Sequence, residues 1–505
     1  MVLGIELGST RIKGVTIDDM FRVRQTGVHD WENRLEDGYW TYGLDEIQAG
    51  LRDVVSQIDT NNITALGISA MMHGYLCFDK DGNLLTPFRT WRNTTTETAA
   101  AKLTGLFSFN IPQRWSVAHL YQAVINNEPH VKNIAFITTL AGYVHWKLTG
   151  KKVLGVGDAS GMFPVESNIY NEIYMRDFKE LTGIDWASVA PEILSAGENA
   201  GTLTEAGAEY LGLPKSLAGI PLCPPEGDAG TGMVATNSIT PRTGNVSAGT
   251  SVFAMLVLEN ALSKLYPEID MVTTPAGKPV AMVHCNNCTS DFDAWVGLLG
   301  QAMTLMGVPP KKPVLYDTLY QAALSGDPDG GGLVSVNYLS GEHITGFREG
   351  RPLFARTPDS SFTLENFMRV LLLSSMATLK TGMDILTGGE GVSITKLLGH
   401  GGLFKTPVAG QKLMAGALNI PVAVMDSAGE GGAWGIALLA AYAVCKDGDE
   451  SLERFLADKV FSDSAVSVIN PDPADAEGFK TYMARYNAAL SVERAAVAEL
   501  KNRGT

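Results

Sequence analysis

The chain has 505 residues, of which 45% are hydrophobic and 18% charged, and its formal net charge is −15. This length predicts two to four domains with a sizeable core. The acidic balance disfavours nucleic acid and anionic membranes as partners, although a local nest of backbone N–H groups can still bind an anionic ligand.

Cysteine content and the first residues indicate the compartment. Five cysteines, an odd number in a long chain, disfavour a disulfide framework and favour a reducing environment. The opening MVLGIELGST lacks the basic region and apolar run of a signal peptide. We therefore expect a soluble cytoplasmic protein.

The first half of the chain alternates short apolar strands with helical patterns. Two strands joined by a Gly-Ser-Thr turn predict a β-hairpin at the start. Strands are expected at residues 2–6, 12–17, 63–69, 75–78 and 220–223, and helices at 96–106, 118–126, 140–148 and 229–235.

The second half repeats this alternation. Strands are expected at residues 244–248, 252–257, 396–402 and 421–425, and helices at 362–386, 410–418 and 429–442. A polar, helical tail follows from about residue 446. Strands that alternate with helices indicate an α/β fold.

An internal repeat relates the two halves. Residues 4–10 and 244–251 share a strand, a Gly-Ser/Thr turn and a second strand, about half a chain apart. Such a repeat predicts two domains of one fold. We place them at residues 1–240 and 241–505.

The repeated turns have the composition of phosphate-binding loops. Gly8-Ser9-Thr10, with Lys13 nearby, offers consecutive backbone N–H groups and hydroxyls for phosphate oxygens. Glu6, two residues earlier, could hold a Mg²⁺ ion. An ordinary hairpin turn is the alternative for one copy.

The second copy, Gly249-Thr250-Ser251, favours the functional interpretation. Two such turns from homologous halves can clamp one polyphosphate from opposite sides. We name residues 8–10 the first phosphate loop and residues 249–251 the second phosphate loop.

Asp228 lies between a strand end and a helix start. That position favours an N-cap aspartate, and it equally suits a general base that accepts a proton from a substrate hydroxyl.

Two glycine-rich segments, 399–402 and 429–433, also have two interpretations. They allow a ring or phosphate to approach the main chain, or they allow tight helix–sheet packing.

Other nucleotide-binding motifs are missing from the sequence. There is no GxxxxGK[ST] P-loop and no GxGxxG after the first strand, so neither a Walker ATPase nor a Rossmann dehydrogenase fits. His73 and Trp91 are candidate sugar contacts, since a sugar ring stacks on an indole and hydrogen-bonds to an imidazole. Core positions are the alternative for both residues.

In this order, the motifs resemble the FGGY family of carbohydrate kinases, in the actin-like ATPase superfamily, up to about Tyr442. Residues 5–10 with Lys13 are similar to the family's first phosphate loop, with Glu6 where Asp is usual. The family's catalytic base lies in a segment that residues 227–229 resemble, and its second phosphate loop is similar to residues 249–251. Its signature near the adenine site is similar to residues 401–406, 411–415 and 421–422. The helix that follows this signature is similar to residues 430–435.

The sugar side resembles xylulose kinases with departures. Residues 69–74 (SAMMHG) and 158–161 (DASG) are similar to segments of those enzymes, and residues 87–95 (PFRTWRNTT) occupy the place of a Trp-x-Asp-x-Arg motif. Met71, Asn93 and Thr95 stand where Gln, Asp and Arg are common. The acceptor pocket is therefore not a standard xylulose site.

The resemblance implies an α/β protein with two RNase H-like (actin-like ATPase) domains flanking a central cleft. Residues 1–240 would bind the sugar and 241–505 would bind ATP, with Mg²⁺ held by Glu6 and Asp228 and with Asp228 as the catalytic base. Expected contacts to ATP or phosphate are Gly8, Ser9, Thr10, Lys13, Gly249, Thr250, Ser251, Gly401, Gly402, Lys405 and Glu430; expected contacts to the sugar are Met72, His73, Trp91, Arg92, Asn93 and Asp228.

The expected function is ATP-dependent phosphorylation of a ketopentose, either xylulose or ribulose. A kinase for a polyol or a sugar acid, and a non-catalytic actin-like nucleotide-binding switch, are the alternatives. The expected partner is a small-molecule sugar, with neither nucleic acid nor membrane, and family habit suggests a homodimer.

Overall fold

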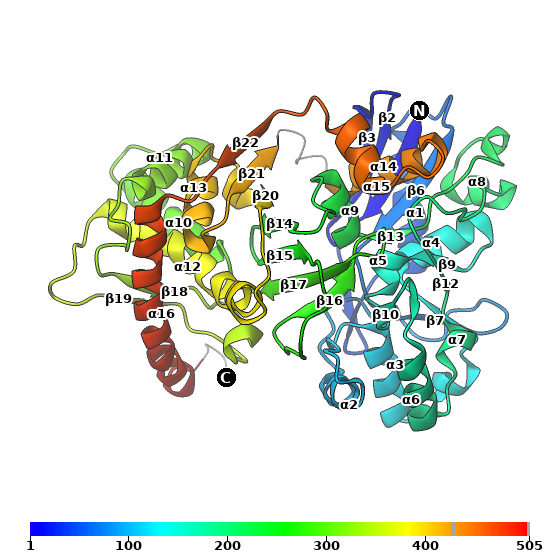
Figure 1. The fold of residues 1–505 in the computed structure, drawn as a ribbon, viewed down its shortest axis with the longest axis horizontal. Helices are drawn as coiled ribbons and strands as arrows, with labels where there is room; N and C mark the ends of the chain where they lie inside the picture. Colours follow the sequence, from blue (N-terminus) through cyan, green and yellow to red (C-terminus); the bar gives the residue numbers. More distant parts are fainter. Residues whose placement is uncertain (426–430, 502–505) are drawn as a thin grey trace. The chain divides into compact units, whose positions relative to one another are not determined.

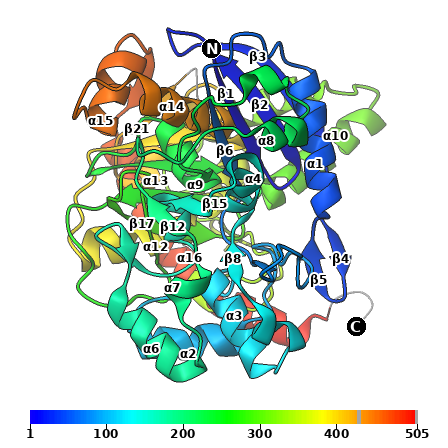
Figure 2. The same ribbon diagram turned by 90° about the vertical axis from the view of Figure 1, so that its right-hand side faces the viewer.

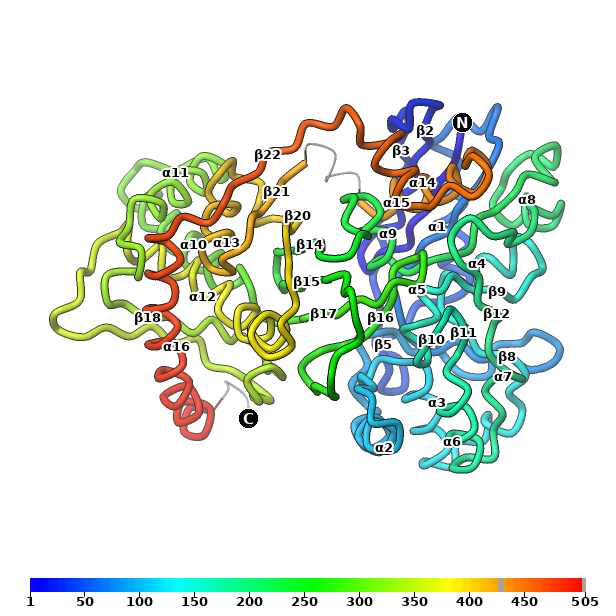
Figure 3. The backbone as a smooth tube through the Cα atoms, viewed as in Figure 1, coloured from blue at the N-terminus to red at the C-terminus, as the bar shows by residue number. Residues whose placement is uncertain are grey.

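The computed structural model describes residues 1–425 and 431–501. The chain forms two compact units, followed along the sequence in Figures 1 and 3. Unit 1 consists of Met1–Ile239, Lys264–Val280 and Glu430–Ser464, and unit 2 consists of Thr240–Ser263, Ala281–Gly429 and Ala465–Thr505. The first change of unit falls beside the predicted boundary at residue 240, and two later segments return to unit 1.

Unit 1 contains a five-stranded sheet in the order β13-β6-β1-β2-β3. The central strand β1 (Val2–Leu7) is antiparallel to β2 (Arg11–Ile17) and parallel to β6 (Ala65–Ala70). The sheet ends at β3 (Val23–Asp30) on one side and at β13 (Glu226–Gly227) on the other. Figure 2 shows β1, β2 and β6 as neighbouring strands.

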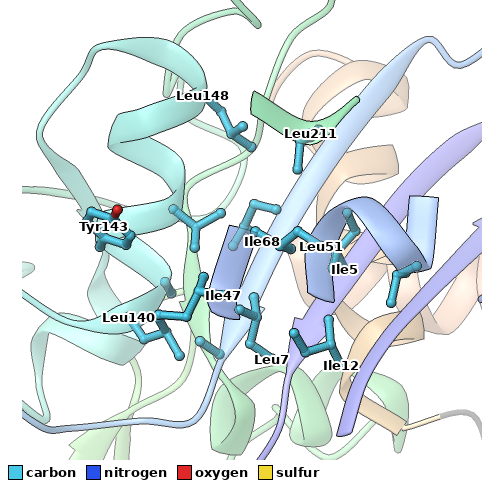
Figure 4. Packing of buried hydrophobic residues seen from close by; sticks show 14 of the residues in the cluster. Ile5, Leu7, Ile12, Ile47, Leu51, Ile68, Leu140, Tyr143, Leu148 and Leu211 are labelled. Atoms are coloured by element: carbon cyan, nitrogen blue, oxygen red, sulfur yellow. The ribbon is translucent and has the colours of Figure 1, made fainter. Parts of the chain in front are cut away.

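One face of this sheet packs against α1 (Leu44–Ser56), α4 (Leu140–Thr149) and α8 (Glu205–Leu211). Figure 4 shows the apolar side chains that meet there: Ile5, Leu7, Ile12, Ile47, Leu51, Ile68, Leu140, Leu148 and Leu211. Each fully buried side chain of this size stabilises the fold by about 2 kcal/mol. This core fixes β1 and β6, which lead into the predicted site.

The helix α14 (Gly431–Cys445) packs closely against β1, β6 and α9 (Asp228–Ala235). A Cβ atom at Gly4 would lie 2.3 Å from the carbonyl oxygen of Ala433, and one at Gly67 would lie 2.7 Å from that of Ile436. These strands carry glycine where a helix backbone approaches them. A late segment of the chain thereby completes unit 1.

Unit 1 contains further helices and strands. They are β4 (Arg34–Glu36), β5 (Tyr39–Thr41), β7 (Leu76–Phe78), α2 (Glu97–Phe107), α3 (Ser116–Ile125), β8 (Phe136–Thr138), β9 (Val153–Gly155), α5 (Val156–Ala159), β10 (Val165–Glu166), β11 (Ile169–Tyr170), α6 (Glu172–Thr182), α7 (Trp186–Val189), β12 (Glu192–Leu194), β16 (Asp270–Thr273) and α15 (Leu452–Phe455).

The strands of unit 2 run in the order β17-β15-β14-β20-β21-β22. The central strand β14 (Thr243–Ala248) is antiparallel to β15 (Val252–Val257) and parallel to β20 (Lys396–His400). The other strands are β17 (Pro279–Cys285), β21 (Val422–Met425), β22 (Val466–Ile469) and the separate pair β18 (Val334–Val336) and β19 (Leu353–Ala355).

The helices of unit 2 are α10 (Ser290–Leu305), α11 (Lys312–Leu324), α12 (Leu364–Asp384), α13 (Ala409–Leu418) and α16 (Pro473–Glu499). The stretch Leu364–Gly389 is long and apolar enough to cross a membrane, but 72% of its apolar 18-residue segment is buried inside the structure. We interpret α12 as a core helix of unit 2.

The two sheets repeat one topology. In unit 1 the order is β3-β2-β1-β6-β13, and in unit 2 the matching order is β17-β15-β14-β20-β21. Each begins with an antiparallel hairpin whose first strand pairs in parallel with a later strand. The predicted α/β class and the predicted repeat of the hairpin are both confirmed.

One predicted strand was wrong, and several helices and strands were missed. Residues 220–223 form only isolated bridges at Pro221 and Leu222, and the strand is β13 instead. Pro221, Pro224 and Pro225 lack the backbone N–H that a ladder needs. The helices α10 and α11 were missed, as was β22 in the tail, where only helix was expected.

Candidate active site

The candidate site of unit 1 lies where three parallel strands end at the same edge of the sheet. In register, Glu6 of β1 lies beside Ser69 of β6, and Ser69 lies beside Glu226 of β13. The chain then leaves the sheet at Gly8 after β1 and at Asp228 after β13. The carboxyl ends of parallel strands are the usual binding edge of an α/β sheet.

Asp228 is the first residue of α9, and Gly227 is the N-cap. The position is therefore not that of an N-cap aspartate. One carboxylate oxygen, Oδ1, accepts hydrogen bonds from the backbone N–H groups of Met72 (3.1 Å) and Ala229 (2.9 Å). Burial raises the pKa of Asp228, and these hydrogen bonds oppose the rise. The carboxylate is thus fixed in orientation.

Glu6 is a second carboxylate in the same place. Burial raises its pKa to about 7, with a further contribution from the charge of Asp228. The backbone N–H of Ala433 donates to its Oε2 (3.2 Å), and that bond and the charge of Lys13 lower the pKa. A Cβ at Gly432 would lie 2.3 Å from Oε1, so a larger residue there would displace this carboxylate.

These two carboxylates fit a Mg²⁺ ion by their chemistry. They are hard oxygen donors that repel each other, and a divalent cation would relieve that repulsion. Among residues 1–425 and 431–501, no group of three or more His, Cys, Asp or Glu side chains could hold a metal. Water and phosphate oxygens would therefore supply the other ligands, as is usual for Mg²⁺.

Two further buried carboxylates lie behind Asp228, and the sequence analysis did not select them. Glu226 accepts hydrogen bonds from the backbone N–H groups of Gly157 (3.2 Å) and Asp158 (2.9 Å). Asp158 accepts one from the Thr139 hydroxyl (2.6 Å). Burial raises the pKa of each to about 8. Asp158 stands in the quoted segment 158–161 and Glu226 directly precedes the segment 227–229, but nothing in the sequence separated them from structural acids.

The first phosphate loop is held from one side by aromatic side chains. The Trp31 indole donates to the carbonyl of Gly8 (2.8 Å), and the Tyr42 hydroxyl donates to the carbonyl of Ser9 (2.5 Å). The indole of Trp91 donates to the Ser9 hydroxyl (3.0 Å). These bonds engage the carbonyls of Gly8 and Ser9 and so fix the position of the loop.

The second phosphate loop is held mainly by backbone donors. The carbonyl of Gly249 accepts from the backbone N–H (3.0 Å) and the hydroxyl (2.9 Å) of Thr289. The carbonyl of Thr250 accepts from the backbone N–H of Cys288 (3.0 Å). Within unit 2 the loop therefore rests on the segment that precedes α10.

The structure brings one predicted glycine pair to this second loop. Gly401 has a positive φ of 97°, and a Cβ there would lie 2.5 Å from the carbonyl oxygen of Ala248. Gly402 begins a 3₁₀ turn that ends before Lys405, which is exposed. Glu430 lies outside the described residues.

Two predicted sugar contacts, Met72 and His73, are buried beside Asp228. His73 has a positive φ of 71°, and its Nδ1 lies 3.0 Å from the carbonyl oxygen of Gly161. A carbonyl only accepts, so Nδ1 carries a proton and donates it to this bond. His73 also stacks on Trp115, with ring centroids 6.3 Å apart.

The other predicted sugar contacts have different environments. Trp91 and Arg92 are exposed, and the Arg92 guanidinium lies 4.3 Å from the centroid of the Trp40 ring. Asn93 is buried. Its amide accepts from the backbone N–H of Trp40 (2.8 Å) and donates to the carbonyls of Trp40 (2.9 Å) and Thr90 (3.0 Å).

The sequence missed several residues that support the loops. Trp31 and Tyr42 stack with ring centroids 4.2 Å apart and contact the first loop from a segment without any recognisable motif. The only signal in the sequence that could have indicated this supporting role is the residue type, since buried Trp and Tyr side chains usually hydrogen-bond through their N–H or O–H group.

Comparison with known proteins shows which family both halves of the chain match. The model of the N-terminal domain of the FGGY family of carbohydrate kinases matches residues 1–234, and that of its C-terminal domain matches residues 244–444. The xylulose kinase of Haemophilus influenzae is 23% identical over 525 aligned residues, which cover 97% of this chain and 99% of that protein. The L-fuculokinase of Escherichia coli is 24% identical over 245 residues, covering 44% of this chain and 49% of that protein.

Solved structures share the fold. The ligand-bound xylulose kinase from Lactobacillus acidophilus superposes with a TM-score of 0.80 at 16% identity, covering 99% of this chain and 98% of that one. The Plasmodium falciparum glycerol kinase with ADP gives a TM-score of 0.78 at 16% identity, covering 97% and 98%. The two-domain α/β fold is thus of the actin-like ATPase type.

Proposed function

The chain belongs to the FGGY family of carbohydrate kinases, and on that premise we propose that it phosphorylates a ketopentose, with xylulose as the first candidate. It is an ATP-dependent sugar kinase that uses Mg²⁺. The relatives named xylulose kinase support the choice of acceptor. The observation that carries the proposal is the fixed Asp228 carboxylate beside Met72 and His73.

Asp228 is the proposed general base. Its Oδ1 is held by two backbone N–H groups, which leaves Oδ2 to accept the proton of a sugar hydroxyl. Burial raises the pKa of Asp228, which makes the carboxylate a stronger base than an exposed aspartate. The sugar oxygen, once deprotonated, forms a bond to the γ-phosphorus of ATP while the bond from that phosphorus to the bridging oxygen breaks and ADP leaves.

Glu6 and Asp228 are the residues that would hold Mg²⁺, which supplies neutralisation of phosphate charge. Thr10, Lys13 and Thr250 would stabilise the charge that develops on the transferred group, since such transfer depends on positioning and electrostatics. The roles of Gly249, Ser251, Gly401, Gly402, Lys405 and Glu430 in binding ATP stay predictions.

His73 is proposed to orient the sugar. The hydrogen bond between its Nδ1 and the Gly161 carbonyl fixes the orientation of the imidazole ring. Exposed Trp91 offers a ring face for stacking. Asn93 acts in this proposal through the backbone of Trp40 and not by direct contact, since its amide is buried and engaged there.

A sugar acid is the second candidate acceptor. The exposed guanidinium of Arg92 favours it, because a planar guanidinium suits a carboxylate. A polyol stays an alternative acceptor. The family match replaces the earlier alternative of a non-catalytic nucleotide-binding switch.

We further propose a cytoplasmic location and self-association as a homodimer. All five cysteines are free thiols, and four of them are buried, which suits a reducing compartment. The homodimer rests on family habit. Neither nucleic acid nor a membrane is a proposed partner, given the net charge of −15.

The test is ADP release from Mg·ATP across ketopentoses, ketohexoses, polyols and sugar acids, with Asp228→Ala alongside. We expect one ketopentose to stimulate turnover strongly and the variant to lose at least about a thousandfold in kcat. Preference for a sugar acid would favour the second candidate. Near wild-type turnover by Asp228→Ala would exclude Asp228 as the base.

A further inference from the structure

The second phosphate loop rests on a two-residue step that is itself held in place. Cys288 and Thr289 donate their backbone N–H groups to the carbonyls of Thr250 and Gly249, at 3.0 Å each. Thr289 adds its hydroxyl to the carbonyl of Gly249 at 2.9 Å. The position of the loop therefore depends on the position of residues 288 and 289.

The two residues before this step are held by one buried carboxylate. The Oε2 of Glu342 accepts from the backbone N–H groups of Asn286 (2.9 Å) and Asn287 (3.3 Å) and from the side-chain amide of Asn287 (3.1 Å). Its Oε1 lies 3.7 Å from Nδ1 of His343. A single oxygen atom thus gathers three donors from the segment that leads to the loop.

Asn287 and Cys288 are fixed from their other side as well. The Oδ1 of Asn287 accepts from the backbone N–H groups of Leu339 and Ser340, at 3.0 Å each. The carbonyl of Cys288 accepts from the amide of Asn337 (2.8 Å) and the hydroxyl of Ser375 (2.9 Å). Both residues are therefore tied to the neighbouring segments of unit 2.

Burial makes this network sensitive to the loss of one acceptor. The exposed fraction is 0% for Glu342, 5% for Asn287, 1% for Cys288 and 7% for Thr289. Donors left unpaired at such positions carry their full desolvation cost, because water cannot easily replace the acceptor. The segment would shift to find other partners, and the loop carbonyls would shift with it.

We propose that Glu342 and Asn287 form a brace that sets the position of the second phosphate loop for ATP. Glu342 is then a positioning residue, because it acts through Asn287, Cys288 and Thr289 and not by touching the nucleotide. The inference rests on the proposed function in one respect, namely that the second phosphate loop binds the phosphates of ATP.

Unit 2 contains a matched control for this brace. Glu493 is also 0% exposed, and its Oε1 accepts the backbone N–H of Arg351. Each of the two glutamates has one oxygen that forms no hydrogen bond within residues 1–425 and 431–501. Glu493→Ala therefore removes a comparable buried acceptor at a place with no recorded hydrogen bond to the second loop.

The experiment compares Glu342→Ala, Glu342→Gln and Glu493→Ala in the full chain. We expect Glu342→Ala to raise the KM for ATP and the Kd for a non-hydrolysable ATP analogue about tenfold, with the KM for the sugar unchanged. Glu342→Gln should restore both values, because a single amide oxygen can serve the three donors. Glu493→Ala should lower Tm without changing either value.

A second variant covers the case in which Glu342→Ala does not fold. Thr289→Val removes only the hydroxyl that contacts Gly249, and it should raise the same Kd while Thr289→Ser restores it. Equal analogue affinity in wild type, Glu342→Ala and Thr289→Val would overturn the brace. Measuring the Kd requires no turnover. A failure to find a sugar acceptor would therefore contradict the proposed function, whereas the Kd values alone would decide whether the brace exists.

Discussion

The two hairpins that begin the two sheets have the same strand pairing and different chemistry. In each, the turn closes with a glycine N–H that donates to a carbonyl: Gly8 to Arg11 and Gly249 to Ser251, at 2.9 Å each. Two residues before the glycine, the first hairpin carries Glu6 and the second carries Ser247. The two turns differ by one residue, since Leu7 pairs with Ile12 and Ala248 pairs with Val252, and only the first copy carries a carboxylate at this position.

The support of the two loops shows the same contrast. In both units the segment after the outer strand donates a backbone N–H to the loop: Trp31, after β3, to the Thr10 carbonyl (3.2 Å), and Cys288, after β17, to the Thr250 carbonyl (3.0 Å). The first loop adds aromatic donors, whereas the second adds a buried polar network. Equivalent backbone positions therefore tolerate unrelated side chains, provided that the carbonyls stay paired.

Within this comparison of the two hairpins, the largest expected effect comes from replacing the polar side chain at each of the two matching positions. Glu6→Gln removes one of the two carboxylates proposed to hold Mg²⁺, and kcat/KM should fall about a hundredfold. Ser247→Ala, at the matching position, should change kcat/KM by less than about threefold. Steady-state kinetics across a Mg²⁺ titration would measure both, and an equal loss in the two variants would contradict the asymmetry.

A second comparison tests the close approach within the second region. Gly401 has a φ of 97° and no room for a Cβ, whereas a Cβ at Gly249 would meet nothing within 4 Å. Gly401→Ala should cost about 2 kcal/mol in the free energy of unfolding. Gly249→Ala should stay within about 0.5 kcal/mol of wild type.

Urea denaturation of both variants measures this difference. Nucleotide affinity adds a separate result for Gly249→Ala, because a methyl group on a loop proposed to bind phosphate should weaken binding without unfolding the protein. Equal stability of the two alanine variants would mean that Gly401 is not constrained by the Ala248 carbonyl.

Sequence patterns could predict the parts of this site that are local. A glycine-hydroxyl turn between two strands identifies a loop from adjacent residues, and both loops lie where the pattern placed them. Asp228 was ambiguous because an N-cap and a base occupy the same stretch of sequence. Its place one residue inside α9, with Gly227 as the cap, removes the capping interpretation.

The supporting contacts could not be predicted in this way. Tyr42 bonds to Ser9 across 33 residues, and Glu342 bonds to Asn287 across 55. Neither pair leaves a periodic or spaced signal, because the contact is created by the topology of the sheet. The strand expected at residues 220–223 failed for a local reason, since Pro221 within it and Pro224 and Pro225 directly after it lack ladder donors.

A third prediction concerns pH, with unit 1 as the more acid-sensitive unit. His119 is fully buried and the pKa of its ring is lowered to about 3, first by burial and then by Arg89. Its stabilising contribution is complete above pH about 6.5 and is lost as the pH falls toward 3, because the unfolded state binds the proton first. The free energy of unfolding should fall by about 1.4 kcal/mol per pH unit in that window for this group.

His119→Phe should remove this slope, and the variant should lose less stability between pH 6.5 and 4 than wild type. Tryptophan fluorescence is a suitable measurement, since of the eight tryptophans only Trp295 belongs to unit 2. His400 of unit 2 has its pKa lowered to about 4 by burial and supplies the comparison. An unchanged pH slope in His119→Phe would show that other groups dominate acid unfolding.

The smallest expected effect tests whether the aromatic support of the first loop acts like the polar support of the second. Tyr42 and Tyr442 each donate a hydroxyl to a backbone carbonyl of unit 1, that of Ser9 at 2.5 Å and that of Glu450 at 2.6 Å. Replacing either with Phe should cost about 1 kcal/mol of stability, the net value of one such bond. Only Tyr42→Phe should also raise the KM for ATP, by about threefold to tenfold, because only the Ser9 carbonyl belongs to a phosphate loop.

If both variants lose the same stability and neither changes that KM, the first loop keeps its shape without Tyr42. The dependence on a supporting residue would then be specific to the second loop, where the donors converge on a single carboxylate oxygen.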